Sequence, residues 1–466
     1  MVWLWALLVW GCTRSAPPQR PDIILLTVDT LRVDHVGAYN PSSPAQTPSM
    51  DRLAQQGIQF TNAWSPISVT GPAFCSLHTG LLPGSHEVVI NIFRGGTPLA
   101  QRHTTLAEHL QHYGYDTGAF VSGFTLREQL GLSQGFQTYD DPPERRNARN
   151  RAGRKTADAA LEWLSHQKGP IFMWYHTFDP HGPLRRWSSP ASSDPRWQRD
   201  ADALNTIARY QRISGISDPN FYAGRYATAV QSADRQIGRI LDGLEQAGRL
   251  ENAIVILTAD HGESFDERVL WFDHGTTPYA EQLHIPLIIK LPSSVRAGER
   301  IDAMVGLADV APSLLEWMGL ENLSRVDGSA QILHGQGTGL MTGESSHCKK
   351  EQGPTCTPIG ARGKLYSARD EQHTLIRRPL PSGVSYELYD RISDPGERTA
   401  MAGLPIPEHL RAAVDAMAAV REQMDLPEPN TAATTVDSDE MEALRALGYI
   451  DDESNEDGAS SETHAH

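Results

Sequence analysis

Residues 21–30, PDIILLTVDT, decide the fold of this chain. The run 23–28 is apolar and rich in β-branched residues, as in a strand that is buried on both faces of a parallel sheet. It ends at Asp29 and Thr30, so polar groups stand at its carboxyl end. In open α/β sheets that edge is where ligands bind. The stretch therefore predicts a buried parallel strand with functional groups at its end.

Apolar runs of the same kind recur along the chain, with helical patterns between them. Further strands are predicted at TGAFVSG (117–123), PIFMWYHTF (170–178), NAIVILTADHGE (252–263) and IPLIIKLP (285–292). Helices are predicted at 106–115, 155–167 and 226–248. This alternation indicates an α/β fold with a doubly wound, mixed sheet sandwiched by helices.

The chain has 466 residues, long enough for one large domain and a smaller appendage. After the main domain, 21–345, short strand patterns and one helix indicate a small C-terminal α+β subdomain over 346–450. Residues 451–466 are polar and acidic, and we expect a disordered tail. The net charge is −16, and Lys and Arg form no stripe, which argues against nucleic acid as a partner.

The N-terminal residues 1–20 have the pattern of an export signal followed by a tether. The apolar run 2–10 is too short to span a bilayer as a helix but suits a signal peptide. Gly11 and Cys12 follow it, which resembles a bacterial lipoprotein signal. We expect lipidation of Cys12 and a membrane-anchored protein of the cell envelope, facing the periplasm or the exterior. A plain secretory signal and a misassigned start are the alternatives.

Two further cysteines, Cys348 and Cys356, flank the turn-like stretch KKEQGPT. They could close a disulfide in an oxidising compartment. Metal binding is the lesser alternative, because no second pair accompanies them.

Polar groups at the predicted strand ends include two carboxylates and an imidazole, from Asp29, Asp260 and His261. Each alone is more often a cap or a surface group, but together at one sheet edge they favour a metal site. Such a set suits Zn²⁺ or Mn²⁺ better than Ca²⁺, which prefers oxygen ligands. A divalent metal, among Zn²⁺, Mn²⁺, Mg²⁺ and Ca²⁺, is the expected cofactor.

Eight stretches, taken in order, resemble the sulfatase branch of the alkaline phosphatase superfamily over roughly residues 21–450. They are PDIILLTVDTLRVDHVGAY, TGPAFCSLHTGLLPGSHEV, GFQTYDDP, HTFDPHGP, IVILTADHGES, DHGTTPYAEQLHIPLIIKLP, ELYDRISDPGER and ALRALGYID. The resemblance implies an alkaline phosphatase-like fold and a metal-dependent hydrolase whose substrate is an anionic phosphate or sulfate ester.

Sulfatases of this branch carry Cys or Ser in a Cys/Ser-x-Pro-x-Arg motif, and that first residue is oxidised to formylglycine. Pro72 matches the proline here, which puts Thr70 at the nucleophile position and Phe74 at the arginine position. Threonine cannot become the aldehyde, so Thr70 resembles instead the phosphodiesterase and phosphoethanolamine-transferase branches. A plain N-cap is the alternative for Thr70. Cys75 fits no such motif and indicates packing.

The resemblance also implies a ligand set and an anion site. Asp29, Thr70, Asp260 and His261 would bind the first metal, and the helix after Thr70 would point its N-terminal amides at the anion. Many relatives have a second Asp where this chain has Thr30, which argues against a hard calcium shell.

In the resemblance, His181 matches a histidine that contacts the transferred group, and His274 matches a position that is Lys in many sulfatases and His in several phosphoesterases. Both are candidate catalytic residues. Together with Asp179 they are also candidates for a second metal or for substrate contacts. The alternative for Asp179 is a turn cap before Pro180.

Three functions remain open at this point. The first is phosphoester cleavage or transfer through Thr70, and the second is sulfate ester hydrolysis without formylglycine. The third is a catalytically silent binder of anionic glycans or lipid head groups. Arg185, Arg186 and Arg196 either attract an acidic substrate or solvate a loop.

Overall fold

The computed structural model describes residues 20–92, 96–142, 150–187, 207–208, 210–213, 216, 218–265, 267–268, 271–346 and 364–424. The predicted signal with Cys12, the pair Cys348 and Cys356, Arg196 and the acidic tail lie outside these residues, as does the side chain of Arg185. Within the described part, no helix combines the length and the apolar character needed to cross a membrane.

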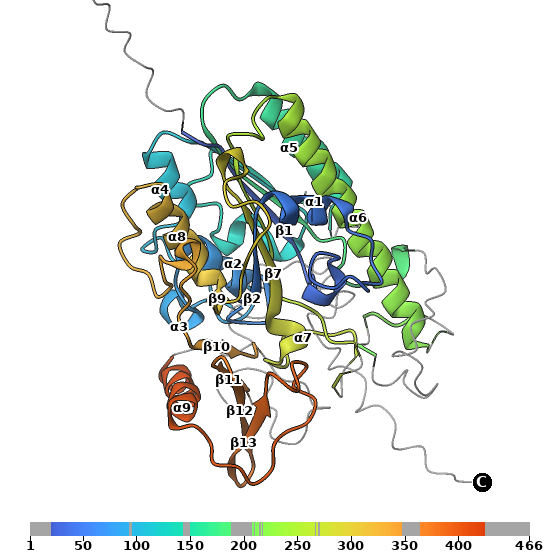
Figure 1. Ribbon diagram of the computed structural model, residues 1–466, viewed down its shortest axis with the longest axis vertical. Helices are drawn as coiled ribbons and strands as arrows, with labels where there is room; N and C mark the ends of the chain where they lie inside the picture. The colour runs from blue at the N-terminus through green and yellow to red at the C-terminus, as the bar shows by residue number, and fades with distance from the viewer. Residues whose placement is uncertain are drawn as a thin grey trace, which may run out of the picture.

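Nine strands of the described chain form one large sheet (Figure 1), ordered β4-β3-β5-β1-β6-β7-β2-β8, with β9 pairing to β2. Their bounds are β1 (Ile23–Val28), β2 (Ile58–Trp64), β3 (Asp116–Val121), β4 (Thr138–Asp140), β5 (Ile171–Thr177), β6 (Ile254–Ala259), β7 (His284–Lys290), β8 (Glu299–Ile301) and β9 (Val305–Gly306). The five neighbouring strands β4, β3, β5, β1 and β6 run parallel to one another, whereas β7 is antiparallel to β6 and β2. The predicted mixed α/β sheet is confirmed.

The first strand of the described residues, β1, lies between β5 and β6. All six residues of β1 are buried, as expected for a strand covered on both faces. Its last residue, Val28, pairs with Thr177 of β5 and Ala259 of β6. The residues that follow these three strands therefore emerge together at one edge of the sheet.

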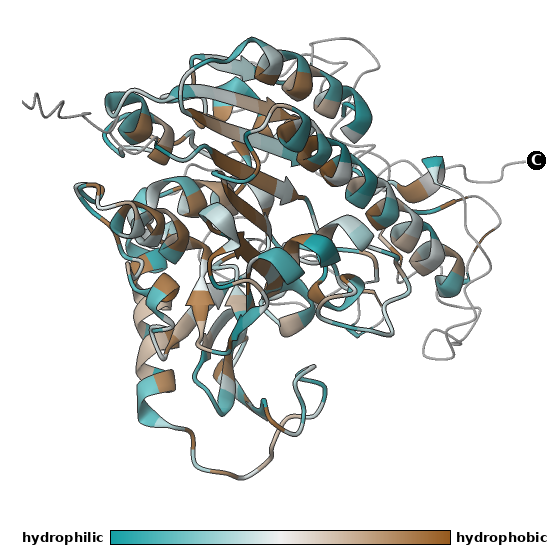
Figure 2. Cartoon of the chain, turned by 45° about the horizontal axis from the view of Figure 1, so that its top comes forward, coloured by the Kyte–Doolittle hydropathy of each residue, from teal (hydrophilic) through white to brown (hydrophobic). Residues whose placement is uncertain are grey.

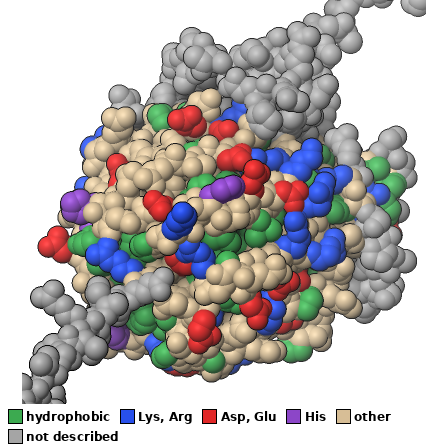
Figure 3. All heavy atoms as spheres, turned by 90° about the horizontal axis from the view of Figure 1, so that it is seen from above, with side chains coloured by type: hydrophobic (Ala, Val, Ile, Leu, Met, Phe, Trp, Pro, Cys, Tyr) green, Lys and Arg blue, Asp and Glu red, His purple; other side chains and the backbone are tan. Residues whose placement is uncertain are grey.

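Helices cover both faces of the sheet (Figure 1). One group of helices that pack together consists of α1 (Pro48–Gln56), α5 (Gly153–His166) and α6 (Pro219–Gln246). The other group consists of α2 (Thr70–Thr79), α4 (Leu106–His112) and α8 (Val310–Trp317). The short helices are α3 (Pro83–His86) and α7 (Ala280–Leu283). Hydrophobic residues concentrate in the central strands, and the outer helix faces are hydrophilic (Figure 2). Seen from above, acidic and basic side chains are interspersed, with several Lys and Arg towards one side (Figure 3).

A four-stranded antiparallel sheet forms the C-terminal subdomain, in the order β10 (Met341–Glu344), β11 (Tyr366–Arg369), β12 (His373–Leu380) and β13 (Gly383–Asp390). Its helix α9 (Glu408–Gln423) packs against β11 and β12. This sheet begins at β10, ahead of residue 346, where the sequence pattern changes.

Buried ion pairs fix this subdomain. Arg421 of α9 pairs with Glu344 of β10, and both side chains are at most 3 % exposed. Arg369 pairs with Glu397 at 3.0 Å and also donates to the Pro278 carbonyl of the main domain. The subdomain is thus tied to the segment that follows His274.

Candidate metal centre and active site

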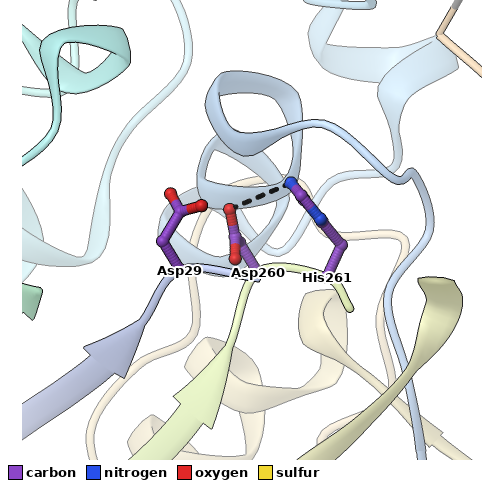
Figure 4. A group of neighbouring side chains, drawn as sticks. All are labelled: Asp29, Asp260 and His261. Carbon is purple, nitrogen blue, oxygen red and sulfur yellow. Dashed lines mark ion pairs between the residues drawn. The ribbon is translucent and has the colours of Figure 1, made fainter. Parts of the chain in front are cut away.

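Three side chains converge at the carboxyl edge of the large sheet (Figure 4). Asp29 follows β1, and Asp260 and His261 follow β6. Their potential ligand atoms all lie within 4.8 Å of one another, and all three residues are fully buried. The predicted cluster is therefore brought together because β1 and β6 are parallel neighbours in register.

One atom of each residue in the cluster has no hydrogen-bond partner although it is buried: Asp29 Oδ1, Asp260 Oδ2 and His261 Nε2. His261 Nδ1 lies 2.8 Å from the Gly262 carbonyl, to which it donates, so a neutral ring presents a lone pair at Nε2. Buried polar atoms without partners are costly and rare. Two carboxylate oxygens and an imidazole nitrogen are the donor set of a divalent transition-metal site, so these residues fit the expected cation.

The electrostatics of the cluster also fit a cation. Burial, and then the nearby charge of Asp260, raise the pKa of Asp29 well above its usual value. Burial lowers the pKa of His261. Two carboxylates packed in a dry interior repel each other, and a divalent cation between them would favour the ionised carboxylates and the neutral imidazole.

Thr30 holds one oxygen of this cluster in place through a strained backbone. Its φ of 53° lies in the left-handed region, which is unusual for a β-branched residue. Its amide donates to Asp260 Oδ1 at 3.1 Å, and its hydroxyl donates to the Asp29 carbonyl at 2.8 Å. Tyr226 donates to the Thr30 carbonyl at 2.6 Å. The Thr30 hydroxyl therefore bonds to the backbone and is not one of the candidate ligands.

Thr70 lies beside the metal cluster. It is the first residue of α2, and its Oγ1 donates to Asp29 Oδ2 at 3.3 Å. The N-cap of that helix is Val69, which makes no side-chain cap bond, so the alternative of Thr70 as a plain N-cap is wrong. All ten residues of α2 are buried, which fixes this hydroxyl at the edge of the sheet.

Three positions at the start of α2, Gly71, Pro72 and Ala73, offer no free amide to an anion, contrary to what the sequence suggested. The Gly71 amide donates to Asn91 Oδ1 at 2.9 Å, and the Ala73 amide donates to the Val69 carbonyl at 3.1 Å. Pro72 has no N–H. The expectation of an anion-binding turn is thus wrong for these positions, because a buried side chain and a backbone carbonyl satisfy the amides. Asn91 is a residue of the site that no sequence signal indicated.

The neighbours of Thr70 in α2 are packing residues. Phe74, at the arginine position of the resemblance, is fully buried with its ring 5.2 Å from that of Trp174 and 5.0 Å from that of His176. Cys75 is fully buried in the main core, and burial raises the pKa of its thiol. The interpretation of Cys75 as a packing residue is confirmed.

Two more histidines stand in a row with His261. The ring centroid of His274 is 4.6 Å from that of His261 and 4.9 Å from that of His181. His274 Nδ1 lies 3.3 Å from both carboxylate oxygens of Glu263, a partner that sequence reasoning did not single out. His181 stacks on Phe178 at 4.0 Å and its Nδ1 donates to the Gly182 carbonyl at 2.6 Å. The imidazole of His274 therefore lies beside His261, and that of His181 lies next to His274.

Asp179 does not join these histidines, which corrects the predicted second metal set. Its Oδ1 accepts from the Gly153 amide at 3.0 Å, and its Oδ2 accepts from Ser232 Oγ at 3.0 Å. Arg186 donates to its carbonyl at 3.1 Å. Asp179 thus anchors the start of α5 and a loop. Among the described residues, Asp29, Asp260 and His261 form the one group of carboxylates and histidines that could hold a metal ion.

Comparison with known proteins identifies the family of the chain. The sulfatase family profile matches residues 21–320, and a profile described as N-sulphoglucosamine sulphohydrolase, C-terminal, matches residues 267–423. The chain is 26% identical to a multifunctional alkaline phosphatase superfamily protein of Trinickia caryophylli, over 67% of this chain and 76% of that protein. It is 24% identical to an N-acetylglucosamine-6-O-sulfatase of Bacteroides thetaiotaomicron, over 67% and 70%.

A similar solved structure is the phosphonate monoester hydrolase of Agrobacterium radiobacter. The TM-score is 0.68 at 22% identity, covering 87% of this chain and 96% of that one. This likeness shows the fold, and the family profile spans more than half of the sequence. The chain belongs to the sulfatase family of the alkaline phosphatase superfamily.

Proposed function

We propose that the chain is a metal-dependent hydrolase that cleaves or transfers phosphoester groups through the hydroxyl of Thr70. The observation that carries this proposal is the contact of Thr70 Oγ1 with Asp29 Oδ2, 3.3 Å away, beside three buried ligand atoms that have no hydrogen-bond partner. A divalent cation bound by Asp29, Asp260 and His261 would lower the pKa of the Thr70 hydroxyl and neutralise charge on the substrate.

In the first half of the reaction, Thr70 Oγ attacks phosphorus and a covalent phosphothreonine forms. The bond between phosphorus and the leaving-group oxygen breaks, and that oxygen needs a proton. His274 is our candidate to give it, because its ring lies beside that of His261, with centroids 4.6 Å apart, and Glu263 contacts its Nδ1. The Thr70 hydroxyl gives its proton to solvent as it attacks. Water then attacks phosphorus and its proton passes to His274, the bond to Thr70 Oγ breaks, Thr70 Oγ takes a proton back from solvent, and the phosphoryl product leaves.

Sulfate esters are the second candidate substrate, since relatives of this chain are named as sulfatases. A covalent sulfothreonine lacks the geminal hydroxyl of formylglycine, whose deprotonation expels sulfate by C–O cleavage. The second half of a sulfatase cycle would therefore stall on Thr70. Within the described residues, the cysteine of this helix, Cys75, is buried in the core and offers no substitute nucleophile.

A substrate panel tests the proposal. Purified protein is stripped of metal, supplied with Zn²⁺, Mn²⁺, Mg²⁺ or Ca²⁺, and assayed on an aryl phosphate, an aryl phosphodiester, a phosphonate monoester and an aryl sulfate. We expect phosphorus esters to be the better substrates. Thr70→Ala should lower turnover about a thousandfold or more, and Thr70→Ser should keep part of it. The matched control is Cys75→Ala in the same helix, which should stay active.

The opposite result would be turnover of the aryl sulfate alone, or activity that survives Thr70→Ala. A silent binder would show metal-dependent affinity for these esters without turnover of any.

For the location, we propose a lipid anchor at Cys12, on the strength of the apolar run and the Gly11–Cys12 pair alone. Cys12→Ala should release the protein from membranes. A wild type that fractionates as a soluble protein would contradict the anchor.

A further inference from the structure

His176 is a buried histidine of β5 that the proposed reaction leaves without a role. Its side chain is fully buried, and its Nε2 is 3.4 Å from Asp29 Oδ2 and has no hydrogen-bond partner of good geometry. Asp29 Oδ2 also accepts the bond from Thr70, whereas Asp29 Oδ1 has no partner. The imidazole thus faces Oδ2, and Oδ1 is the oxygen of Asp29 that has no partner.

The other nitrogen of His176 shows which way the ring donates. Thr27 Oγ1 lies 3.0 Å from His176 Nδ1 and 3.3 Å from the Tyr175 carbonyl oxygen. The same Thr27 oxygen accepts a hydrogen bond from Trp174 Nε1 at 2.9 Å. The shorter contact favours the Thr27 hydroxyl as donor to Nδ1, which leaves the proton of a neutral ring on Nε2. A lone pair at Nε2 would instead face a carboxylate oxygen in a dry interior, where repulsion is strong.

Packing holds the ring at that angle. Phe74 meets it edge to face at 5.0 Å, and Phe178 does so at 6.3 Å. Phe74 stands where the resemblance places an arginine, so this chain has an apolar contact to His176 where that motif has a positive charge. The ring of His176 therefore has few orientations open to it.

The same construction holds the other two members of the cluster. Asp260 is held through Oδ1 by the Thr30 amide, and His261 is held through Nδ1 by the Gly262 carbonyl. In both residues the remaining atom is the unpartnered one. We propose that His176 is the positioning residue of Asp29: its Nε2–H donates to Oδ2 and directs Oδ1 to the cation.

This role matters most when Thr70 reacts. As the Thr70 hydroxyl loses its proton it can no longer donate to Asp29 Oδ2, and the His176 N–H remains as the donor to that oxygen. The inference rests on the metal centre of the proposed function, but its test needs no substrate.

The test measures the affinity of the metal-stripped full chain for Mn²⁺ and Zn²⁺ by competition with a chelator. Outer-shell partners of metal ligands are typically worth 10- to 100-fold in metal affinity, so His176→Ala should weaken binding by about that factor. His176→Gln, which carries an N–H at similar reach, should restore most of the affinity. The matched control is His78→Ala, another fully buried histidine that packs on Trp174, with ring centroids 4.4 Å apart.

Three results would overturn the inference. His176→Ala could bind the cation as tightly as the wild type, or His78→Ala could lose as much affinity as His176→Ala. The visible spectrum of the Co²⁺-loaded protein could also change its band positions in His176→Gln, which would make His176 a ligand instead. A wild type that binds none of Mn²⁺, Zn²⁺, Mg²⁺ and Ca²⁺ would refute the proposed function itself, which separates the two failures.

Discussion

Asp260→Asn should stabilise the metal-free protein while it abolishes metal binding. The amide oxygen that it introduces can still accept from the Thr30 amide, which now donates to Asp260 Oδ1 at 3.1 Å. The new amide nitrogen takes the place of Oδ2, which lies 3.3 Å from His261 Nε2 and has no hydrogen-bond partner. A donor there can reach the lone pair of that nitrogen. The substitution therefore removes a buried charge and adds a hydrogen bond without changing the shape of the side chain.

The magnitude follows from the separation of the two carboxylates. Their ligand atoms lie within 4.8 Å of each other, and at an effective dielectric constant of 20 two charges at that distance repel by about 3 kcal/mol. Protonation of Asp29, whose pKa burial and Asp260 raise, already relieves part of this in the metal-free protein. We expect a net gain of about 1–2 kcal/mol in the free energy of unfolding. At a free cation concentration a hundred times the Kd, the wild type gains about 2.7 kcal/mol that the variant does not.

Thermal unfolding in EDTA and in Mn²⁺ or Zn²⁺ measures both effects. The order of stability should reverse: Asp260→Asn above the wild type in EDTA, and below it with the cation. A variant that unfolds well below the wild type in EDTA would refute the reasoning about the carboxylate pair. A wild type whose unfolding does not respond to any cation would refute the metal centre.

Three further changes probe residues around the centre. Burial lowers the pKa of His78 to about 3 from an ordinary 6.5. Between these values the unfolded chain binds a proton that the folded chain does not, so the free energy of unfolding falls as the pH drops below 6.5. His78→Leu should remove about 2 kcal/mol of this fall at pH 5, measured by denaturant titration. Phe74→Arg should place a charge in the core beside His176, and we expect poor folding and weakened metal affinity, measured by thermal unfolding and chelator competition. Arg421→Ala leaves Glu344 buried without its partner and should cost about 3–5 kcal/mol, seen as early proteolysis of the C-terminal subdomain; unchanged protease resistance would contradict this.

The strand-end residues of the metal cluster could be predicted from the sequence because strand geometry alone brings them together. Asp29 and Asp260 each follow an apolar run, and parallel neighbours in register must end at the same edge. His176 could not be predicted in this way. It lies inside IFMWYHT, where every residue is buried, and a histidine within such a run has the same pattern whether it packs or positions a ligand.

The corrections made at Asp179 and at the first amides of α2 have a common cause. A strand-end carboxylate such as Asp179 can bind a cation or receive backbone amides, and the position of Gly153 in space decides between these uses. The amides of a helix start are free only when nothing else accepts from them, and Asn91, which accepts from Gly71, belongs to an irregular stretch without periodicity. Tertiary contacts of this kind leave no trace in local patterns.

The central place of β1 has a bearing on how the protein is made. Among the described strands it is the first to leave the ribosome, but its partners come much later: Thr27 contacts His176 across 149 residues, and Thr30 contacts Asp260 across 230. Contacts so distant along the chain form slowly, and the nascent β1 stays unpaired and prone to association until β5 and β6 have been synthesised. A cation held by the proposed ligands could not nucleate this assembly, because Asp29 follows β1 whereas Asp260 and His261 follow β6. It would bind only once the sheet is complete, so that a chelator present during refolding should leave the early steps unchanged and alter only the last one.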